Sequence, residues 1–229
     1  VMGPTGSGKY SFINLISGSN LRVGEDLKSC TKAVETSSTF ELDGQRVVLV
    51  DTPGFDDTTK SDADVLRLVS HYLVTSWVSS KRPFAGILYF HRISDFRMGG
   101  ISRRNFQVFR ELCGDTTLAN VVIVTNMWGE VTPALGNKRE QQLVADDMFF
   151  APAIAAGAKH LRHHDTIESA EAILHQIVHN TPLTFKIQEE IVDGKNNLNQ
   201  TAAGGMLFSD LQAMEERHRR EKEEMQLQM

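Results

Sequence analysis

The chain has 229 residues, of which 41% are hydrophobic and 23% charged, and its formal net charge is −5. This composition is typical of a globular protein, and the negative net charge argues against nucleic acid as a partner. No apolar run approaches the roughly 20 residues that a transmembrane helix needs. The two cysteines, Cys30 and Cys113, are too few for a disulfide framework, so we expect a cytoplasmic protein.

A glycine-rich loop stands almost at the start of the chain. Residues 3–9 read GPTGSGK, a pattern that predicts a loop binding the phosphates of a nucleotide. Glycines let backbone N–H groups approach phosphate oxygens closely. Lys9 adds a positive charge, and the helix predicted from Lys9 to Ile16 adds its dipole. The residues expected to contact nucleotide are Gly3, Pro4, Thr5, Gly6, Ser7, Gly8, Lys9, Tyr10 and Ser11.

The strand that normally precedes such a loop is short here. Phosphate loops usually follow a buried strand of about 5–6 residues, whereas only Val1 and Met2 come before Gly3. We therefore expect the first strand of the sheet to be truncated.

Tyr10 stands where a Ser or Thr hydroxyl usually binds Mg²⁺. A tyrosine oxygen lies about 6.5 Å from its Cα, against about 2.4 Å for serine, so Tyr10 would overshoot the ion. Ser11 is rotated by about 100° around the helix and is a poor replacement. Two interpretations stay open: weakened Mg²⁺ binding with slow or absent hydrolysis, or a gap filled by water, since Mg²⁺ keeps several waters.

A β-hairpin is predicted in residues 38–51. Phe40 and Leu42 alternate with polar residues, and Asp43-Gly44 suits a type I′ turn. The apolar run from Val47 to Val50 predicts a strand that is covered on both faces.

The motif DTPG follows this hairpin. Asp51 is placed to hold Mg²⁺ through water, and the N–H of Gly54 is placed to contact the γ-phosphate. Thr31, about midway between Lys9 and Asp51, is the candidate that senses the γ-phosphate and binds Mg²⁺, with Thr36 as the alternative. The order of lysine loop, antiparallel hairpin and D-x-x-G is that of the Ras-like GTPases. Phe55 takes the place of their water-orienting Gln, which phenylalanine cannot replace.

The remaining elements alternate between helices and buried strands. Apolar periodicity predicts helices and strands in turn over 62–80, 84–91, 101–113, 118–126, 137–149, 158–162 and 165–179. The last of these helices has a capping box of Asp165 and Glu168. The alternation predicts an α/β domain over 1–180, with a mixed, mostly parallel sheet and helices on both faces.

The end of the chain has a different character. Residues 181–229 are predicted to be a helical extension, with a helix from Pro182 to Asp193 and a charged helix over 206–229. Its apolar residues partly follow a heptad pattern, so a short coiled coil is one interpretation, and a helix that folds back on the domain is the other.

Three segments together resemble a known family. VMGPTGSGKYSFINLISG, DTPGFDD and VVIVTNMWGE resemble the septin-like GTPases, and most of all fungal G-domain proteins of the avirulence-induced type, which are related to immunity-associated and chloroplast import receptor GTPases. The resemblance covers about residues 1–180. It implies binding of GTP or GDP with Mg²⁺, GTP hydrolysis as a switch, and a homodimer across the nucleotide face.

The base-reading motif departs from this family. After the strand at 118–126 the sequence has no Lys or Asp of an N-K-x-D motif, so ATP in place of GTP stays an alternative. Asn126 is a candidate to bond a base edge and Trp128 to stack on the base, while a strand-end cap and a core aromatic are the alternatives. His163 is the candidate from the last base-contacting loop.

Four arginines follow the strand at 84–91, where ligands bind in open α/β folds. Arg97 is the candidate arginine finger across a dimer, although surface ion pairs are the more frequent role for arginines. The rival to a GTPase is a pseudoenzyme that binds nucleotide and acts as an interaction module.

Overall fold

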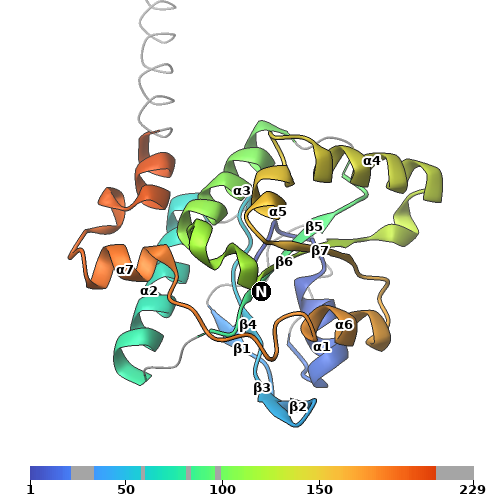
Figure 1. Cartoon of the computed structure of the whole chain (residues 1–229), viewed down its shortest axis with the longest axis horizontal. Helices are drawn as coiled ribbons and strands as arrows, with labels where there is room; N and C mark the ends of the chain where they lie inside the picture. Colours follow the sequence, from blue (N-terminus) through green and yellow to red (C-terminus); the bar gives the residue numbers. More distant parts are fainter. Residues whose placement is uncertain (22–33, 58–59, 81–83, 96–98, 210–229) are drawn as a thin grey trace, which may run out of the picture.

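The core of the molecule is a parallel β-sheet with helices on both faces. The computed structural model describes residues 1–21, 34–57, 60–80, 84–95 and 99–209. Strands β5 (Ile87–Arg92), β6 (Val121–Asn126) and β7 (Lys159–Arg162) lie side by side in that order and run parallel. In Figure 1, α3, α4 and α5 lie above this sheet, and α1 and α6 lie below it. The predicted α/β class is confirmed.

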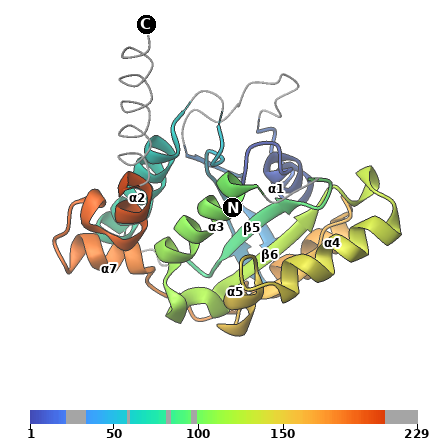
Figure 2. The same ribbon diagram turned by 90° about the horizontal axis from the view of Figure 1, so that it is seen from above.

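The predicted helices are found in the predicted chain order, with one additional short helix at residues 151–155. They are α1 (Lys9–Ser17), α2 (Asp62–Ser80), α3 (Gly100–Cys113), α4 (Pro133–Ala145), α5 (Ala151–Ala155), α6 (Ile167–Leu174) and α7 (Lys186–Val192). Helices α2 and α7 pack together at one end of the molecule (Figure 1, Figure 2). None of the helices in the described residues is both long and apolar enough to cross a membrane.

Alternate residues of the sheet face two separate cores. Tyr89 points toward α3, where its ring centre lies 4.5 Å from that of Phe109. Leu88 and Phe90 point the other way, and Phe90 meets Phe12 of α1 edge-on at 5.0 Å. This alternation is typical of a strand covered on both faces. Packing of α1 against β5 places the start of α1 and the end of β5 at the same edge of the sheet.

The predicted hairpin is present. Its strands and their antiparallel neighbours are β1 (Glu35–Thr36), β2 (Phe40–Leu42), β3 (Gln45–Val47) and β4 (Val50–Asp51), with β2 paired to β3 and β1 to β4. Asp43 and Gly44 have φ values of 50° and 72°. Two positive φ values at the turn agree with the predicted type I′ geometry.

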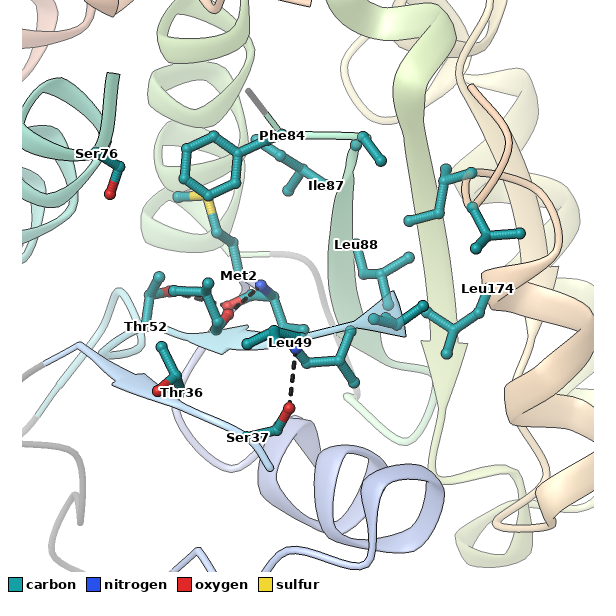
Figure 3. Close-up of a pocket in the computed structure, with 18 of the residues that line it drawn as sticks. Met2, Thr36, Ser37, Leu49, Thr52, Ser76, Phe84, Ile87, Leu88 and Leu174 are labelled. Atoms are coloured by element: carbon teal, nitrogen blue, oxygen red, sulfur yellow. Dashed lines mark hydrogen bonds between the residues drawn. The ribbon is translucent and has the colours of Figure 1, made fainter. Parts of the chain in front are cut away.

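The prediction of one covered strand from Val47 to Val50 is wrong. Strand β3 ends at Val47, β4 begins at Val50, and Val48 between them is 47% exposed. The physical reason is that none of the strands in the described residues lies on the β5 side of this segment, where the structure has a cavity of about 800 Å³ (Figure 3).

Two predicted helix boundaries are displaced by local capping. Helix α4 begins at Pro133 instead of residue 137, because the Thr132 hydroxyl accepts a hydrogen bond from the N–H of Leu135 at 3.4 Å and proline suits the first turn. It ends at Ala145, ahead of the predicted residue 149, and α5 follows.

Helix α6 is capped by Thr166, not Asp165. The Thr166 hydroxyl accepts from the Ser169 N–H at 3.2 Å, whereas Asp165 has a φ of 56° and lies outside the helix. The helix ends at Leu174, earlier than the predicted His179.

The segment after residue 180 shares the core of the sheet. Helix α7 starts at Lys186 and not at Pro182, because Leu183 makes a β-bridge with Phe84. Phe185 and Leu207 are buried in the same cluster as residues of α2 and α3. Most of the helix predicted over 206–229, with its heptad pattern, lies outside the described residues.

Candidate functional site

The glycine-rich loop has the backbone shape that its sequence predicts. Gly3, Gly6 and Gly8 have φ values of 138°, 74° and 89°, which side chains strongly disfavour. A Cβ on Gly3 would lie 2.4 Å from the Phe90 carbonyl oxygen. The loop therefore needs glycine at these positions, and α1 begins directly after it at Lys9.

The loop is fastened to the sheet at both ends. Met2 donates its N–H to the Leu88 carbonyl and accepts from the Phe90 N–H, both at 2.8 Å. On the other side, Asn126 Nδ2 donates to the Ser7 carbonyl at 3.1 Å, and Asn126 is fully buried. Asn126 thus supports the loop, and its predicted contact with a base edge stays a prediction.

Lys9 is folded into the loop. Its Nζ donates to the carbonyl oxygens of Gly3 at 3.0 Å and Pro4 at 2.9 Å, and the residue is 4% exposed. Burial lowers the pKa of Lys9 from 10.5 to about 8, and the carboxylates of Asp51 and Asp57 partly oppose this. An ammonium at the centre of a glycine loop, beside a helix N-terminus, is an arrangement suited to phosphate.

The DTPG segment lies directly against the loop. The Thr5 N–H donates to the Phe55 carbonyl at 3.1 Å, and a Cβ on Gly54 would lie 2.5 Å from the Thr5 nitrogen. The structure therefore brings Gly54 next to the loop. The Phe55 side chain is 1% exposed and packs in the core, so it takes no part in the surface of the site.

Polar contacts among Asp56, Asp62 and Arg104, which we call the clip, fix the segment that follows the DTPG motif. Asp62 Oδ1 accepts from the Asp56 N–H at 2.8 Å, and Asp62 Oδ2 pairs with Arg104 Nη2 of α3 at 2.6 Å. Asp56 has a positive φ of 64°. Desolvation, with the charge of Asp62, raises the pKa of Asp56. The clip joins the DTPG segment to the start of α2 and to α3.

The residues predicted to hold Mg²⁺ fit that role only in part. Asp51 is fully buried at the end of β4, and its charge acts on Lys9 of the loop; its role toward Mg²⁺ stays a prediction. Tyr10 is half-buried on the first turn of α1, and Ser11 is exposed. Thr31, the other predicted ligand, lies outside the described residues.

Arg92 is the arginine that the structure places beside the loop. It is the last residue of β5, and its Nη1 lies 3.2 Å from the position of a Cβ on Gly6. Its Nε is paired with Asp95 Oδ1 at 2.9 Å. Arg97, the predicted arginine finger, lies outside the described residues.

The loop after β6 differs from the base-reading prediction in its details. Met127 has a φ of 63°, and its Cε lies 3.3 Å from the position of a Cβ on Gly8. The Trp128 indole N–H donates to the Thr125 carbonyl at 3.1 Å, and the guanidinium of Arg162 stacks on the indole ring at 4.1 Å. Trp128 is therefore already packed on one face, and its stacking on a base stays a prediction.

His163 lies in the interior, under α1. It is 1% exposed, its Nδ1 is 2.8 Å from the Ser169 hydroxyl, and its ring meets Phe12 edge-on at 5.0 Å. Burial lowers the pKa of His163. The side chain supports α1 in this position, and its contact with a base also stays a prediction.

Sequence reasoning missed two residues beside the loop, Arg92 near Gly6 and Met127 near Gly8. Arg92 ends β5 and pairs in register with Asn126 at the end of β6, and Met127 follows Asn126 directly. The available signal was their position: polar residues that end apolar strands gather at the ligand edge of an α/β sheet.

Comparisons with known proteins agree with this geometry. Residues 1–91 match the family model described as 50S ribosome-binding GTPase. A dimerization-deficient mutant of Toc33 from Arabidopsis thaliana has a similar structure, with a TM-score of 0.57, 16% identity, and coverage of 72% of this chain and 69% of that chain. Toc33 in complex with Mg²⁺ and GMPPNP gives a TM-score of 0.54 at 17% identity and the same coverage.

A more distant structure has the same architecture. The elongation factor SelB from Methanococcus maripaludis, in complex with a GTP analogue, gives a TM-score of 0.50 at 11% identity and covers 80% of this chain and 34% of its own. Likeness at these identities concerns the fold. From the loop, the sheet and these comparisons, the chain has the fold of the Ras-like P-loop GTPases, and its first 91 residues match a family model of such GTPases.

Proposed function

We propose that this chain binds GTP and GDP through the glycine loop, with Mg²⁺, and hydrolyses GTP slowly as a switch. The observation that carries the proposal is Lys9, a buried ammonium held by the Gly3 and Pro4 carbonyls inside a loop of three positive-φ glycines. A bound triphosphate would give this cation an anionic partner and the loop amides acceptors.

Each residue of the site has a proposed role. Lys9 and the loop amides hold the β- and γ-phosphates, Gly54 offers its N–H to the γ-phosphate, and Arg92 adds a second positive charge at the rim of the loop. Asp51 is the residue that would hold Mg²⁺ through water, and the ion would neutralise charge on the phosphates. Thr31 is proposed to report the γ-phosphate.

Slow hydrolysis follows from two substitutions. Tyr10 lacks a hydroxyl at the distance that Mg²⁺ needs, and Phe55 packs in the core and cannot orient water. A partner copy is the proposed source of the missing group, with Arg97 as the finger. Support comes from a similar solved structure, which is described by the statement that dimerization is important for the GTPase activity of the chloroplast translocon components atToc33 and psToc159. It gives a TM-score of 0.60 at 14% identity and covers 77% of this chain and 79% of that chain.

Titration with fluorescent GTP, GDP and ATP in the presence of Mg²⁺ tests the binding proposal. We expect GTP to bind, and Lys9→Met to weaken binding by about 100-fold, because charge-assisted hydrogen bonds to phosphate are lost. Lys138→Met, on the exposed face of α4, is the matched control and should bind as wild type. Absence of binding to every purine nucleotide would refute the proposal, and tighter binding of ATP would replace GTP by ATP.

Two observations favour a second candidate, a nucleotide-binding pseudoenzyme: Tyr10 at the Mg²⁺ position and the buried Phe55. Turnover separates the candidates. If Tyr10→Ser raises GTP turnover at least about tenfold while Tyr10→Phe does not, the missing short hydroxyl limits a competent GTPase. If neither variant turns over while both bind GTP, the chain acts as a pseudoenzyme.

A further inference from the structure

The indole of Trp128, two residues after the end of β6, is held in one orientation by contacts on three sides. Its N–H donates to the Thr125 carbonyl at 3.1 Å. One edge of the ring lies against α4, because a Cβ on Gly136 would come within 2.7 Å of the indole carbon Cζ3. The guanidinium carbon of Arg162 lies over one face, 4.1 Å from the ring centre. These contacts leave the side chain little freedom to turn.

Arg162, the last residue of β7, is itself held by two residues of α4. Its Nε donates to Glu140 Oε1 at 2.8 Å, its Nη2 donates to Glu140 Oε2, and Nη2 also donates to Asn137 Oδ1 at 3.0 Å. The Glu140 side chain is only 14% exposed. A bidentate pair fixes the direction of the guanidinium plane as well as its distance. We call Trp128, Asn137, Glu140 and Arg162 the Arg162 cluster.

The residue before Trp128 has an unfavourable backbone conformation and lies against the glycine loop. Met127 has a φ of 63°, which residues other than glycine seldom adopt. Such a conformation persists where the surrounding structure fixes it, and here the next side chain is the held indole. The Cε of Met127 lies 3.3 Å from the position of a Cβ on Gly8. The Arg162 cluster therefore holds Met127 beside the loop through Trp128.

We propose that Arg162 is a positioning residue for the base of the bound nucleotide, an inference that rests on the proposed function. Through Trp128 it holds residues 127–130 beside the glycine loop. Ligands of open α/β folds lie at the carboxyl ends of parallel strands, and these residues follow directly on the end of β6. The base of a nucleotide whose phosphates are in the loop would lie along this edge. Arg162 acts through the indole, because its Nε and Nη2 donate to α4.

The shape of the guanidinium is essential to this role. A planar guanidinium can stack on the indole while its edge pairs with both oxygens of one carboxylate, whereas a lysine ammonium is a point charge and cannot do both. The phosphates have separate partners in Lys9 and the loop amides. Loss of Arg162 should therefore weaken the binding of the base and spare that of the phosphates.

Competition titrations with GTP and with inorganic tripolyphosphate, both in the presence of Mg²⁺, separate the base from the phosphates. Arg162→Met should raise the Kd for GTP about tenfold, because residues 127–130 are no longer held, and should change the Kd for tripolyphosphate less than about twofold. Arg162→Lys keeps a cation beside Glu140, which protects the fold, and should lose GTP affinity in the same way.

Arg67→Met is the matched control. Arg67 is an exposed residue of α2 that also pairs with a carboxylate, Asp64 at 3.0 Å, and also lies over an aromatic ring, that of Phe208 at 5.6 Å. This variant should bind GTP and tripolyphosphate as wild type does.

The fluorescence of Trp128 gives a second readout that needs no nucleotide. The other tryptophan of the chain is Trp77 in α2, so a Trp77→Phe background isolates Trp128. In this background Arg162→Met should raise the quenching of Trp128 by acrylamide at least about twofold, because one face of the indole loses its cover. Arg67→Met should leave the quenching unchanged.

Two results would overturn the inference. One is a wild-type protein that binds GTP while Arg162→Met and Arg162→Lys keep the wild-type ratio of the two Kd values, even if both variants unfold at lower temperature; Arg162 would then act on stability alone. The other is unchanged quenching of Trp128 in Arg162→Met. Absence of GTP binding in the wild type itself would refute the proposed function and with it the role toward a base, and the quenching would still decide whether Arg162 holds the indole.

Discussion

Burial disfavours the charged form of the Lys9 side chain, and a bound nucleotide should offset this effect. In the free protein its pKa is lowered to about 8, because burial disfavours the charged form and the charge of Arg92 adds to this. Bound phosphate favours the ammonium and so raises its pKa. Below pH 8 the ammonium is already present and affinity should be constant with respect to this group. Above pH 8 the nucleotide Kd should rise, by up to about tenfold per pH unit.

Nucleotide titrations at pH 7, 8 and 9 measure this slope. Lys9→Met has no proton to lose, so its weaker binding should be nearly independent of pH over this range. A slope of equal size in Lys9→Met would show that another group titrates.

Residue-level prediction works where the chemistry is local, and it does not reach contacts between residues that are distant in the sequence. The positive φ values of Gly3, Gly6 and Gly8 follow from seven consecutive residues, and the sequence predicted them as a phosphate loop. For Asn126 the sequence offers a base contact, which stays a prediction, and it does not indicate that Nδ2 donates to the Ser7 carbonyl, 119 positions away. No local pattern specifies which buried acceptor an amide will meet.

The prediction of helices and strands shows the same contrast between local patterns and distant neighbours. Helix α2 was predicted over 62–80 and is observed at Asp62–Ser80, because its apolar period is strong and Asp62 starts it. The run from Val47 to Val50 predicted a covered strand, but coverage depends on a neighbouring strand, and a cavity of about 800 Å³ lies there instead.

The clip between the DTPG segment and α3 is an element-scale interaction that can be measured. Arg104 and Asp62 are joined at 2.6 Å, and their side chains are only 21% and 11% exposed. Arg104→Ala leaves the Asp62 carboxylate largely buried beside the Asp56 N–H, so we expect a loss of about 1–3 kcal/mol in the free energy of unfolding in urea.

Arg110→Ala is the matched control on the same helix. Arg110 pairs with Asp115 at 3.6 Å, and the Asp115 side chain is 80% exposed. Pairs of this kind contribute little, so the control should lose less than about 1 kcal/mol. Equal losses of unfolding free energy in the two variants would mean that the pair of Arg104 and Asp62 contributes no more to stability than an exposed ion pair on the same helix.

At the scale of the whole molecule, both cores meet on the parallel sheet, and a buried histidine lies in its strand β5. His91 is 3% exposed, and its ring meets that of Phe150 edge-on at 5.5 Å. Burial lowers the pKa of His91 from 6.5 to about 4, and the nearby charges of Arg92 and His160 act in the same direction. Burial also lowers the pKa values of His160 and His163.

These histidines should make the fold sensitive to mild acid. Because the unfolded chain binds protons at higher pH than the folded one, the contribution of His91 is complete above about pH 6.5 and is lost as pH falls toward 4. A pKa lowered to about 4 corresponds to about 3 kcal/mol over that window. Urea unfolding at pH 7 and pH 4.5 should therefore show a smaller loss of stability in His91→Leu than in wild type.

His179→Leu separates this effect from general acid sensitivity. The His179 side chain is 57% exposed and lies 3.5 Å from Asp43 Oδ2, where water screens its charge. We expect this variant to lose as much stability on acidification as wild type, because the substituted side chain is largely exposed. If His91→Leu lost as much stability on acidification as wild type and His179→Leu, the acid response would have to originate in carboxylates, and the buried imidazole would not couple protonation to the sheet.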